Sequence, residues 1–488
     1  MDILRKTIKK LSDTEYQALL LQVAGKKKNK PFMVLETTRT RDDLDDTDMM
    51  QMLQVNPSAY YTLKSRLNSK IAEILSKKID NPIKDLMEEV VRVPANLYAT
   101  NKDFSIRALK ELEKQLKEYD MNNELITVYK TLAQLHLFHD DYEYYDKLYT
   151  KHVAYSLAVS KAEQLFYLFT KKMGIYLLTL NHEDLEEVIL IKREMSNIAE
   201  LYDSHRLFVL YNIVRIYYMC SIPEKRQELK SIELEIETTL KKIRDTFEKY
   251  PLDTFYSNVK QIADVLNYEY YQKINNQVRA DHYLNRLNDV IVDWSAKHSM
   301  LFFVTQFLRS KVEKFLNDSD IQKLTELNAP LEQSFESNIN EAYHFISFRL
   351  FISISKFYSK DYHGAAKAIN DLRNSMSLKH YVHADIECKL FQAINYCMMG
   401  EDSLCHQIIA SLKRQTIDIE HEYESTKIFI KILKTAMKPA DYRKKIKRIN
   451  ELYGKFEEAN TGAKPVLKFL KMDEAIIRKM TNPIKDEE

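Results

Sequence analysis

The chain has 488 residues, of which 45% are hydrophobic and 30% are charged, and its formal net charge is +2. This composition is that of a folded protein rather than a disordered one, and the near balance of charge excludes a global field that would attract nucleic acid or an anionic membrane. Six glycines and ten prolines are few for this length, so helices with short connections are favoured over strands and tight turns.

The sequence contains no signal that predicts catalysis, secretion or membrane insertion. The first residues lack the apolar core of a signal peptide, and no apolar run approaches the roughly 20 residues that span a bilayer. Gly-rich phosphate loops, nucleophile elbows and the HExxH zinc motif are all missing. We therefore expect a cytoplasmic protein that is not an enzyme and has no catalytic residue, no cofactor and no metal.

Helices are predicted from the start of the chain. Apolar residues recur at helical spacing over 1–25, a second helix is expected over 32–40, and a third runs from the acidic stretch 42–48 to Leu53. A break at Pro57 is followed by a long amphipathic helix that ends before Pro82. These elements predict a small helical domain over residues 1–80.

Within this block, residues 49–67 resemble a helix-turn-helix. The residues that this resemblance places towards a DNA groove are Tyr61, Lys64, Ser65 and Arg66. Two features count against DNA binding: Gln54 stands where the tight turn usually has Gly, and the aspartates of 42–48 would repel the phosphate backbone. A helical domain that packs on the rest of the chain is the favoured interpretation.

From about residue 123 to 435 the sequence repeats one pattern, in which an aromatic-rich helix meets a short acidic or Asn-containing turn and a second helix follows. The turns are centred on Asp141, Asp184, Glu224, Asn276, Asp318, Asp361 and Glu401. Successive centres are 40 to 43 residues apart, except for 52 residues between Glu224 and Asn276. A near-constant period in this range is typical of stacked two-helix repeats, and the long gap predicts a distorted repeat near 225–255, with one long charged helix over 228–249.

The clearest repeat, residues 351–372, resembles a tetratricopeptide repeat. Its matching positions are the first-helix aromatic Tyr358, the turn Lys360-Asp361-Tyr362 and the small residues Ala365 and Ala366 at the helix crossing; the next unit has Tyr396, Gly400-Glu401-Asp402 and Cys405. A small residue lets the two backbones approach, and an aromatic ring fills the space beside them. One extra turn in each helix lengthens a 34-residue repeat to about 41 residues.

The resemblance implies an all-α fold, a right-handed superhelical α-solenoid of antiparallel helix hairpins with a period of about 40 residues. The solenoid is expected over 81–438, between the N-terminal domain and C-terminal capping helices over 439–488 that begin with a basic helix at 443–448.

By the same resemblance, the first helices of the hairpins line a concave surface that binds a peptide or another protein. Arg215, Arg309 and Arg349 lie on these or adjacent helices beside aromatic residues, where a guanidinium can clamp a peptide carboxylate. The competing interpretation is an arginine that lies over its own helix. A non-enzymatic interaction scaffold with a protein or peptide partner is the expected function.

Two histidine clusters are candidates for a metal site. His136 and His139 precede Asp140 and Asp141, and a second cluster joins His380, His383 and Glu387 on one helical face. Each offers at most three local ligands, whereas structural sites use four, so exposed or capping histidines are favoured. Two rival functions stay open: a one-component transcription regulator with an N-terminal helix-turn-helix and a repeat sensor, and a self-assembling structural protein.

Overall fold

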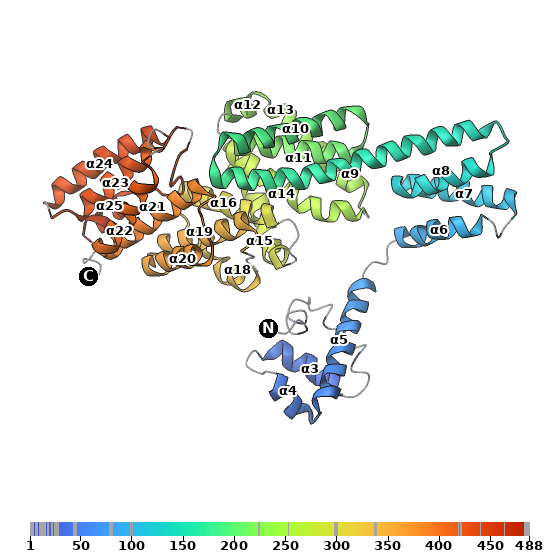
Figure 1. Cartoon of the computed structure of the whole chain (residues 1–488), viewed down its shortest axis with the longest axis horizontal. Coiled ribbons are helices and arrows are strands. Elements are labelled where there is room, and N and C mark those ends of the chain that lie inside the picture. Colours follow the sequence, from blue (N-terminus) through green and yellow to red (C-terminus); the bar gives the residue numbers. More distant parts are fainter. Residues whose placement is uncertain are drawn as a thin grey trace. The chain divides into compact units, whose positions relative to one another are not determined.

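The computed structural model describes most of the chain. The described residues are 4, 8, 16, 19, 20, 23, 29–41, 46–77, 82–97, 99, 101–222, 225–251, 253–296, 301–335, 339–417, 419, 422–439, 441–462 and 464–482. Over these residues the chain forms helices and no strand, as Figure 1 shows. The predicted all-α class is therefore confirmed. The chain divides into two compact units, Met1–Val153 and Ala154–Glu488.

The first unit begins with a small three-helix core. Its helices are α3 (Lys30–Thr40), α4 (Asp46–Leu53) and α5 (Pro57–Lys77). Asn29 caps α3 by accepting a hydrogen bond from the Phe32 amide. The buried side chains are Leu4, Ile8, Leu19, Val34, Leu35, Met49, Leu53, Tyr60, Leu67 and Ile71. Most of the predicted helix over 1–25, and the aspartates at 42–45, lie outside the described residues.

A second apolar core follows in the same unit. It is formed by α6 (Pro82–Asn96), α7 (Lys102–Glu118), α8 (Asn122–Leu135) and the start of α9 (Asp141–Thr179). Leucines and valines at helical spacing on α6 and α7 face Tyr129 of α8, which is fully buried.

Consecutive helices of the second unit pack in pairs. The pairs are α10 (His182–Leu201) with α11 (His205–Ser221), α14 (Thr254–Lys273) with α15 (Gln277–Ala296), α19 (Ala342–Tyr358) with α20 (Tyr362–Ser375), α21 (Val382–Met399) with α22 (Asp402–Gln415), and α23 (Glu424–Met437) with α24 (Tyr442–Ala459). The other helices are α12 (Arg226–Ser231), α13 (Glu233–Lys249), α16 (Leu301–Asp318), α17 (Ile321–Thr325), α18 (Asn328–Ser334) and α25 (Glu474–Thr481). One continuous apolar core runs through this unit to Met480.

Six helices also contact one another in order: α11 of the α10–α11 pair, the first helices of the later pairs, and α16, which belongs to no pair. Helix α11 touches α14, and the contacts continue from α14 to α16, from α16 to α19, from α19 to α21 and from α21 to α23. We call these six helices the first-helix layer. On each helix of this layer, some side chains face away from the neighbouring pair partner. Because the helices lie in contact one after another, these side chains can form one shared surface.

The recurring turn is a left-handed helix end. Asn275, Lys360 and Gly400 have positive φ angles of 61°, 66° and 77°. In each case the next residue donates a backbone hydrogen bond five residues back, which closes the preceding helix as a Schellman motif. These bonds run from Asn276 to Tyr271, from Asp361 to Lys356 and from Glu401 to Tyr396, each 2.9 Å long.

The turn between α19 and α20 matches the predicted repeat. The Asp361 side chain caps α20 by accepting the Gly364 amide at 2.8 Å. Ala365 and Ala366 are buried where the two helices meet, and the Ser353 hydroxyl donates to the Ala365 carbonyl at 2.8 Å. A larger side chain at Ala365 would push this contact apart, so the small residue is required by packing.

The region between Glu224 and Asn276 differs from its prediction. Instead of one charged helix over 228–249, the chain forms the short α12 and the longer α13 with a break at Ile232, whose φ of −115° and ψ of 25° are not helical. Leu229 and Ile236 are both buried on either side of the break, so the break lets both apolar faces reach the core.

No helix in the part of the chain described by the structure is long and apolar enough to cross a membrane. The predicted domain limits at residues 80 and 438 stay predictions.

Candidate functional site

A non-helical stretch of the chain lies on the first-helix layer. Residues 464–473, which we call the C-terminal segment, form no helix and precede α25. Glu387 of α21 accepts the Leu467 amide at 2.8 Å. The Tyr358 hydroxyl of α19 donates to the Phe469 carbonyl at 2.9 Å and accepts the Lys471 amide at 3.0 Å. Side chains of two neighbouring helices thus hold the backbone of this segment, which turns at Leu467, where φ is 54° and the carbonyl accepts the Leu470 amide at 2.9 Å.

Apolar contacts fix the same segment. Val466 and Leu467 are fully buried, and the Phe469 ring meets Phe391 of α21 edge-to-face, with centroids 5.0 Å apart. Asn460 binds both backbone groups of Val466, at 2.8 Å each. The segment is therefore part of the folded core and covers this portion of α19 and α21.

Charged side chains remain accessible on α16, next to the covered portion. From Phe302 to Phe315 this helix is buried apart from Arg309, whose side chain is 43% exposed, and Glu313, whose side chain is 39% exposed. Lys273 of α14 donates to Glu313 Oε2 at 2.6 Å. Arg309 Nε lies 3.9 Å from Glu313 Oε1, which is an ionic contact but too long for a hydrogen bond.

Lys468 of the C-terminal segment interacts electrostatically with these groups. It is exposed, and its charge acts on Arg309, Glu313, Glu387 and Lys273. We call Lys273, Arg309, Glu313, Glu387 and Lys468 the charged cluster. Its members come from α14, α16, α21 and the segment, so the fold gathers residues almost 200 positions apart.

Burial shifts the pKa values of two members of the charged cluster. Burial lowers the pKa of Lys468, and the charge of Arg309 lowers it further. Burial opposes ionisation of Glu313, but Lys273 and Arg309 outweigh it and hold the pKa of Glu313 below its usual value. Lys468 and Glu313 are thus accessible to solvent and yet partly desolvated by the protein around them.

A buried carboxyl group lies on α14, the helix that also carries Lys273 of the charged cluster. Glu269 is 2% exposed, and burial raises its pKa to about 7, although hydrogen bonds from Ser310 and Gln306 favour the ionised form. The Ser310 hydroxyl donates to Glu269 Oε1 at 2.8 Å, and Tyr343 donates to Gln306 Oε1 at 2.9 Å. This network joins α14, α16 and α19 beneath the accessible residues.

Of the three arginines predicted to bind a partner, only Arg309 belongs to the charged cluster. Arg215 of α11 is held by Glu235 of α13, with Nη2 and Oε1 2.5 Å apart. The Arg349 guanidinium lies over the Phe345 ring of its own helix at 5.6 Å, and its Nε is buried without a hydrogen-bond partner among the described residues.

The predicted DNA-facing residues lie on α5. Tyr61, Ser65 and Arg66 are exposed, whereas Lys64 is bound by Asp46, with Nζ and Oδ2 2.9 Å apart. Gln54 has a φ of 50°, the left-handed conformation that a helix-turn-helix turn requires. The Val55 amide closes α4 on the Met50 carbonyl in the same Schellman pattern as the repeat turns, so this geometry does not by itself indicate DNA binding.

The two histidine clusters differ in how close together their possible metal-ligand atoms lie. One ligand atom from each of His136, His139 and Asp141 lies within 4.8 Å of the others. His139 Nδ1 accepts the Asp141 amide at 3.2 Å, which is a capping contact. In the second cluster the His383 and Glu387 side chains are 3.7 Å apart, and burial lowers the pKa of His383 to about 3.

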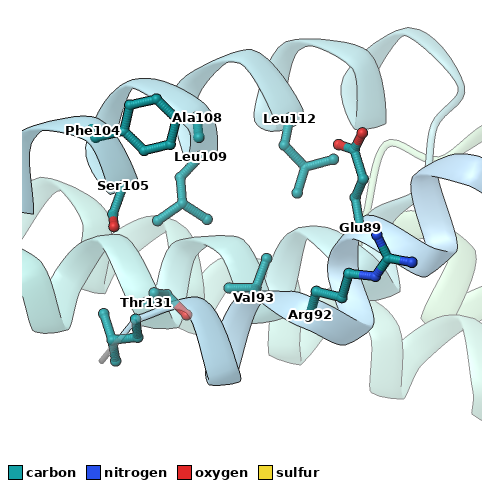
Figure 2. Close-up of a pocket in the computed structure, with 10 residues that line it drawn as sticks. Glu89, Arg92, Val93, Phe104, Ser105, Ala108, Leu109, Leu112 and Thr131 are labelled. Carbon is teal, nitrogen blue, oxygen red and sulfur yellow. The ribbon is translucent and has the colours of Figure 1, made fainter. Parts of the chain in front are cut away.

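A separate pocket of about 310 Å³ lies between α6, α7 and α8 of the first unit (Figure 2). Its walls are Glu89, Arg92, Val93, Leu97, Phe104, Ser105, Ala108, Leu109, Leu112 and Thr131. Two of its polar side chains have partners of their own: Thr131 donates to the Thr127 carbonyl at 2.8 Å, and Arg92 lies 3.6 Å from Glu88. Polar and apolar atoms line the pocket about equally.

Sequence reasoning missed Lys273, Glu313 and Lys468. The first two lie on first helices at positions where a charge interrupts an aromatic-rich stretch, which is a usable signal. Lys468 lies in a tail whose path along α19 and α21 no local pattern predicts. Neither a family model nor a curated protein nor a solved structure matches the chain.

Proposed function

We propose that the second unit is a non-enzymatic scaffold that binds an extended peptide of a protein partner along the first-helix layer. The layer would be the concave side of a tetratricopeptide-like solenoid, and the hairpins with their small crossing residues support that architecture.

The observation that carries this proposal is that the layer holds the C-terminal segment by its backbone. Glu387 and Tyr358 bind its backbone groups, at 2.8 to 3.0 Å, while Phe391 packs on one of its side chains. The layer therefore has contacts that hold a non-helical chain: side-chain hydrogen bonds to its backbone and an aromatic contact with one of its side chains. The segment covers α19 and α21 and also reaches α16, where Lys471 donates to the Leu316 carbonyl at 3.4 Å. Arg309 of α16 is the exposed residue beside this covered portion, and we take it as the contact for a partner.

Affinity selection of a random peptide library on the full chain tests the proposal. Arg309→Glu should weaken selected peptides by roughly 2 to 5 kcal/mol, because a carboxylate would replace a cation at the accessible position. Arg215→Glu is the matched control, since that guanidinium is already engaged by Glu235. A library that yields no binder, or binders indifferent to Arg309→Glu, would contradict the proposal.

Nucleic-acid binding by the first core is the second candidate. It is favoured by the short turn between α4 and α5 and by the exposed side chains of Tyr61, Ser65 and Arg66. The contact of Lys64 with Asp46 removes one cation from this surface. Salt-dependent retention of the full chain on duplex DNA, lost in Arg66→Glu, would support this function.

A further inference from the structure

The turn between α8 and α9 brings two histidines and an aspartate together. His136 directly follows α8, His139 lies within the turn, and Asp141 is the first residue of α9. Backbone hydrogen bonds close the turn: the His139 amide donates to the His136 carbonyl at 2.7 Å, and the Tyr142 amide donates to the His139 carbonyl at 3.0 Å. The turn thus holds one possible ligand atom from each of the three side chains within 4.8 Å of the other two.

The distances between these atoms fit a shared metal ion better than direct contacts. Asp141 Oδ2 lies 3.8 Å from His136 Nδ1 and 3.6 Å from His139 Nδ1, and both distances are too long for hydrogen bonds. Two atoms bound tetrahedrally to one ion, each at about 2.1 Å, are about 3.4 Å apart. The carboxylate oxygen is therefore within a few tenths of an ångström of the separation that coordination requires. The exposed His139 ring, whose centroid is 5.5 Å from that of His136, closes the remaining gap by rotating.

The His136 ring is held in place by the second apolar core of the first unit. It is buried and stacks on the Tyr145 ring, with centroids 5.3 Å apart. A ring that packing already orders loses little conformational entropy when it binds an ion. Its Nε2 is buried without a hydrogen-bond partner among the described residues, and its Nδ1 lies 3.8 Å from the Asp141 carboxylate. Buried polar groups normally have partners, so His136 is an exception that coordination at Nδ1 would partly remove.

The donor set indicates which ions fit. Two imidazole nitrogens and one carboxylate oxygen suit Zn²⁺ or Co²⁺, whereas Mg²⁺ and Ca²⁺ prefer oxygen ligands. An ion can enter from solvent, because the His139 and Asp141 side chains are 64% and 49% exposed. The contact that it would replace is weak, since His139 Nδ1 accepts the Asp141 amide at 3.2 Å. Three protein ligands leave one tetrahedral position for water.

We propose that His136, His139 and Asp141 bind one divalent transition-metal ion of the Zn²⁺ class, which ties the end of α8 to the start of α9. Leu137 and Phe138 lie between the two histidines and are 55% and 100% exposed, so the ion also fixes the apolar tip of this turn. The site lies in the first unit and is independent of the peptide binding proposed for the second.

The first arm of the test titrates Co²⁺ into the EDTA-treated full-length protein and follows the visible absorption of the bound ion. Absorption should saturate at one ion per chain and disappear when Zn²⁺ is added. His139→Gln and Asp141→Asn should each raise Kd at least roughly tenfold, because loss of even an outer-shell partner costs about that much. His182→Gln is the matched control, since His182 is also exposed and lies 3.3 Å from Glu186 on α10.

The site is overturned if Co²⁺ does not bind, if either ligand variant binds it as tightly as wild type, or if His182→Gln weakens binding equally. Competition by Mg²⁺ as strong as that by Zn²⁺ would overturn the imidazole ligands. Circular dichroism confirms the fold of each variant. Because the His139 and Asp141 side chains are accessible, these two variants keep the test valid even if substitution of the buried His136 unfolds the protein.

The second arm measures whether the ion fixes the turn. Chymotrypsin cleaves after Phe138 only when the turn opens, and the open turn lacks the three-ligand site. With Zn²⁺ at 100 times Kd, cleavage there should slow by up to about a hundredfold relative to cleavage after Tyr442, an exposed residue of the second unit. The slowing should be lost in His139→Gln. No slowing relative to Tyr442, or slowing that His139→Gln retains, overturns the site.

Discussion

Removing the Tyr358 hydroxyl should loosen the C-terminal segment from the first-helix layer. This hydroxyl donates to the Phe469 carbonyl at 2.9 Å and accepts the Lys471 amide at 3.0 Å. A hydrogen bond of this kind contributes about 1 kcal/mol net. Lys471 is exposed, so water can replace its bond, and Tyr358→Phe should cost roughly 1 to 2 kcal/mol.

Limited trypsin digestion measures this loss where it occurs. The segment contains Lys464, Lys468 and Lys471, and cleavage there requires local opening. A local loss of about 1.4 kcal/mol raises the open population, and with it the cleavage rate, about tenfold. Tyr396→Phe is the matched control, because that hydroxyl contacts Asn370 and Gln392 but no residue of the segment.

Cleavage within the segment that is no faster in Tyr358→Phe than in Tyr396→Phe would refute the reasoning. It would mean that the apolar anchors Val466 and Leu467 hold the segment without help from the hydroxyl.

Three further predictions concern the buried carboxyl group, the repeat turn and the first core. Burial raises the pKa of Glu269 to about 7, so the native state binds its proton more tightly than the unfolded state does. The free energy of unfolding should therefore fall by up to roughly 3 kcal/mol as pH rises from about 4.5 to above 7. Denaturant titrations of Glu269→Gln should lack this pH-dependent component, and a Glu269→Gln pH profile identical to that of wild type would count against the burial. Lys360→Gly should raise stability by about 1 kcal/mol, because the φ of 66° strains a lysine but not a glycine; a lower Tm than wild type would show that lysine contacts matter more. Arg66→Glu should leave the free energy of unfolding within about 0.5 kcal/mol of wild type, as expected for an exposed side chain, and a clear loss of stability would mean that Arg66 packs against the fold.

The sequence predicted those features that depend on local pattern. Aromatic and aliphatic spacing placed α19 and α21, and the turn at Asp361 was found because a capping aspartate and small residues must recur where two helices cross at short distance. The all-α class followed from the scarcity of Gly and Pro together with that periodicity.

What the sequence did not predict depends on contacts between distant residues. The path of the C-terminal segment is set by Glu387 and Tyr358, which lie 80 and more positions before it. The break at Ile232 was missed because charges on both sides suggest one continuous helix, whereas burial of Leu229 and Ile236 requires two. Arg215 and Arg309 are equivalent candidates in the sequence. The structure separates them, because Glu235 engages Arg215 through the packing of α13 on α11, which no local pattern predicts.

The central claim is that the first-helix layer binds a peptide through Arg309. Isothermal titration of a selected free-acid peptide into the wild-type chain and into Arg309→Gln tests it most directly. The account predicts that Kd increases at least tenfold in the variant, which corresponds to about 1.4 kcal/mol of lost binding free energy. An unchanged Kd would contradict it, because the accessible guanidinium of α16 would then lie outside the binding surface.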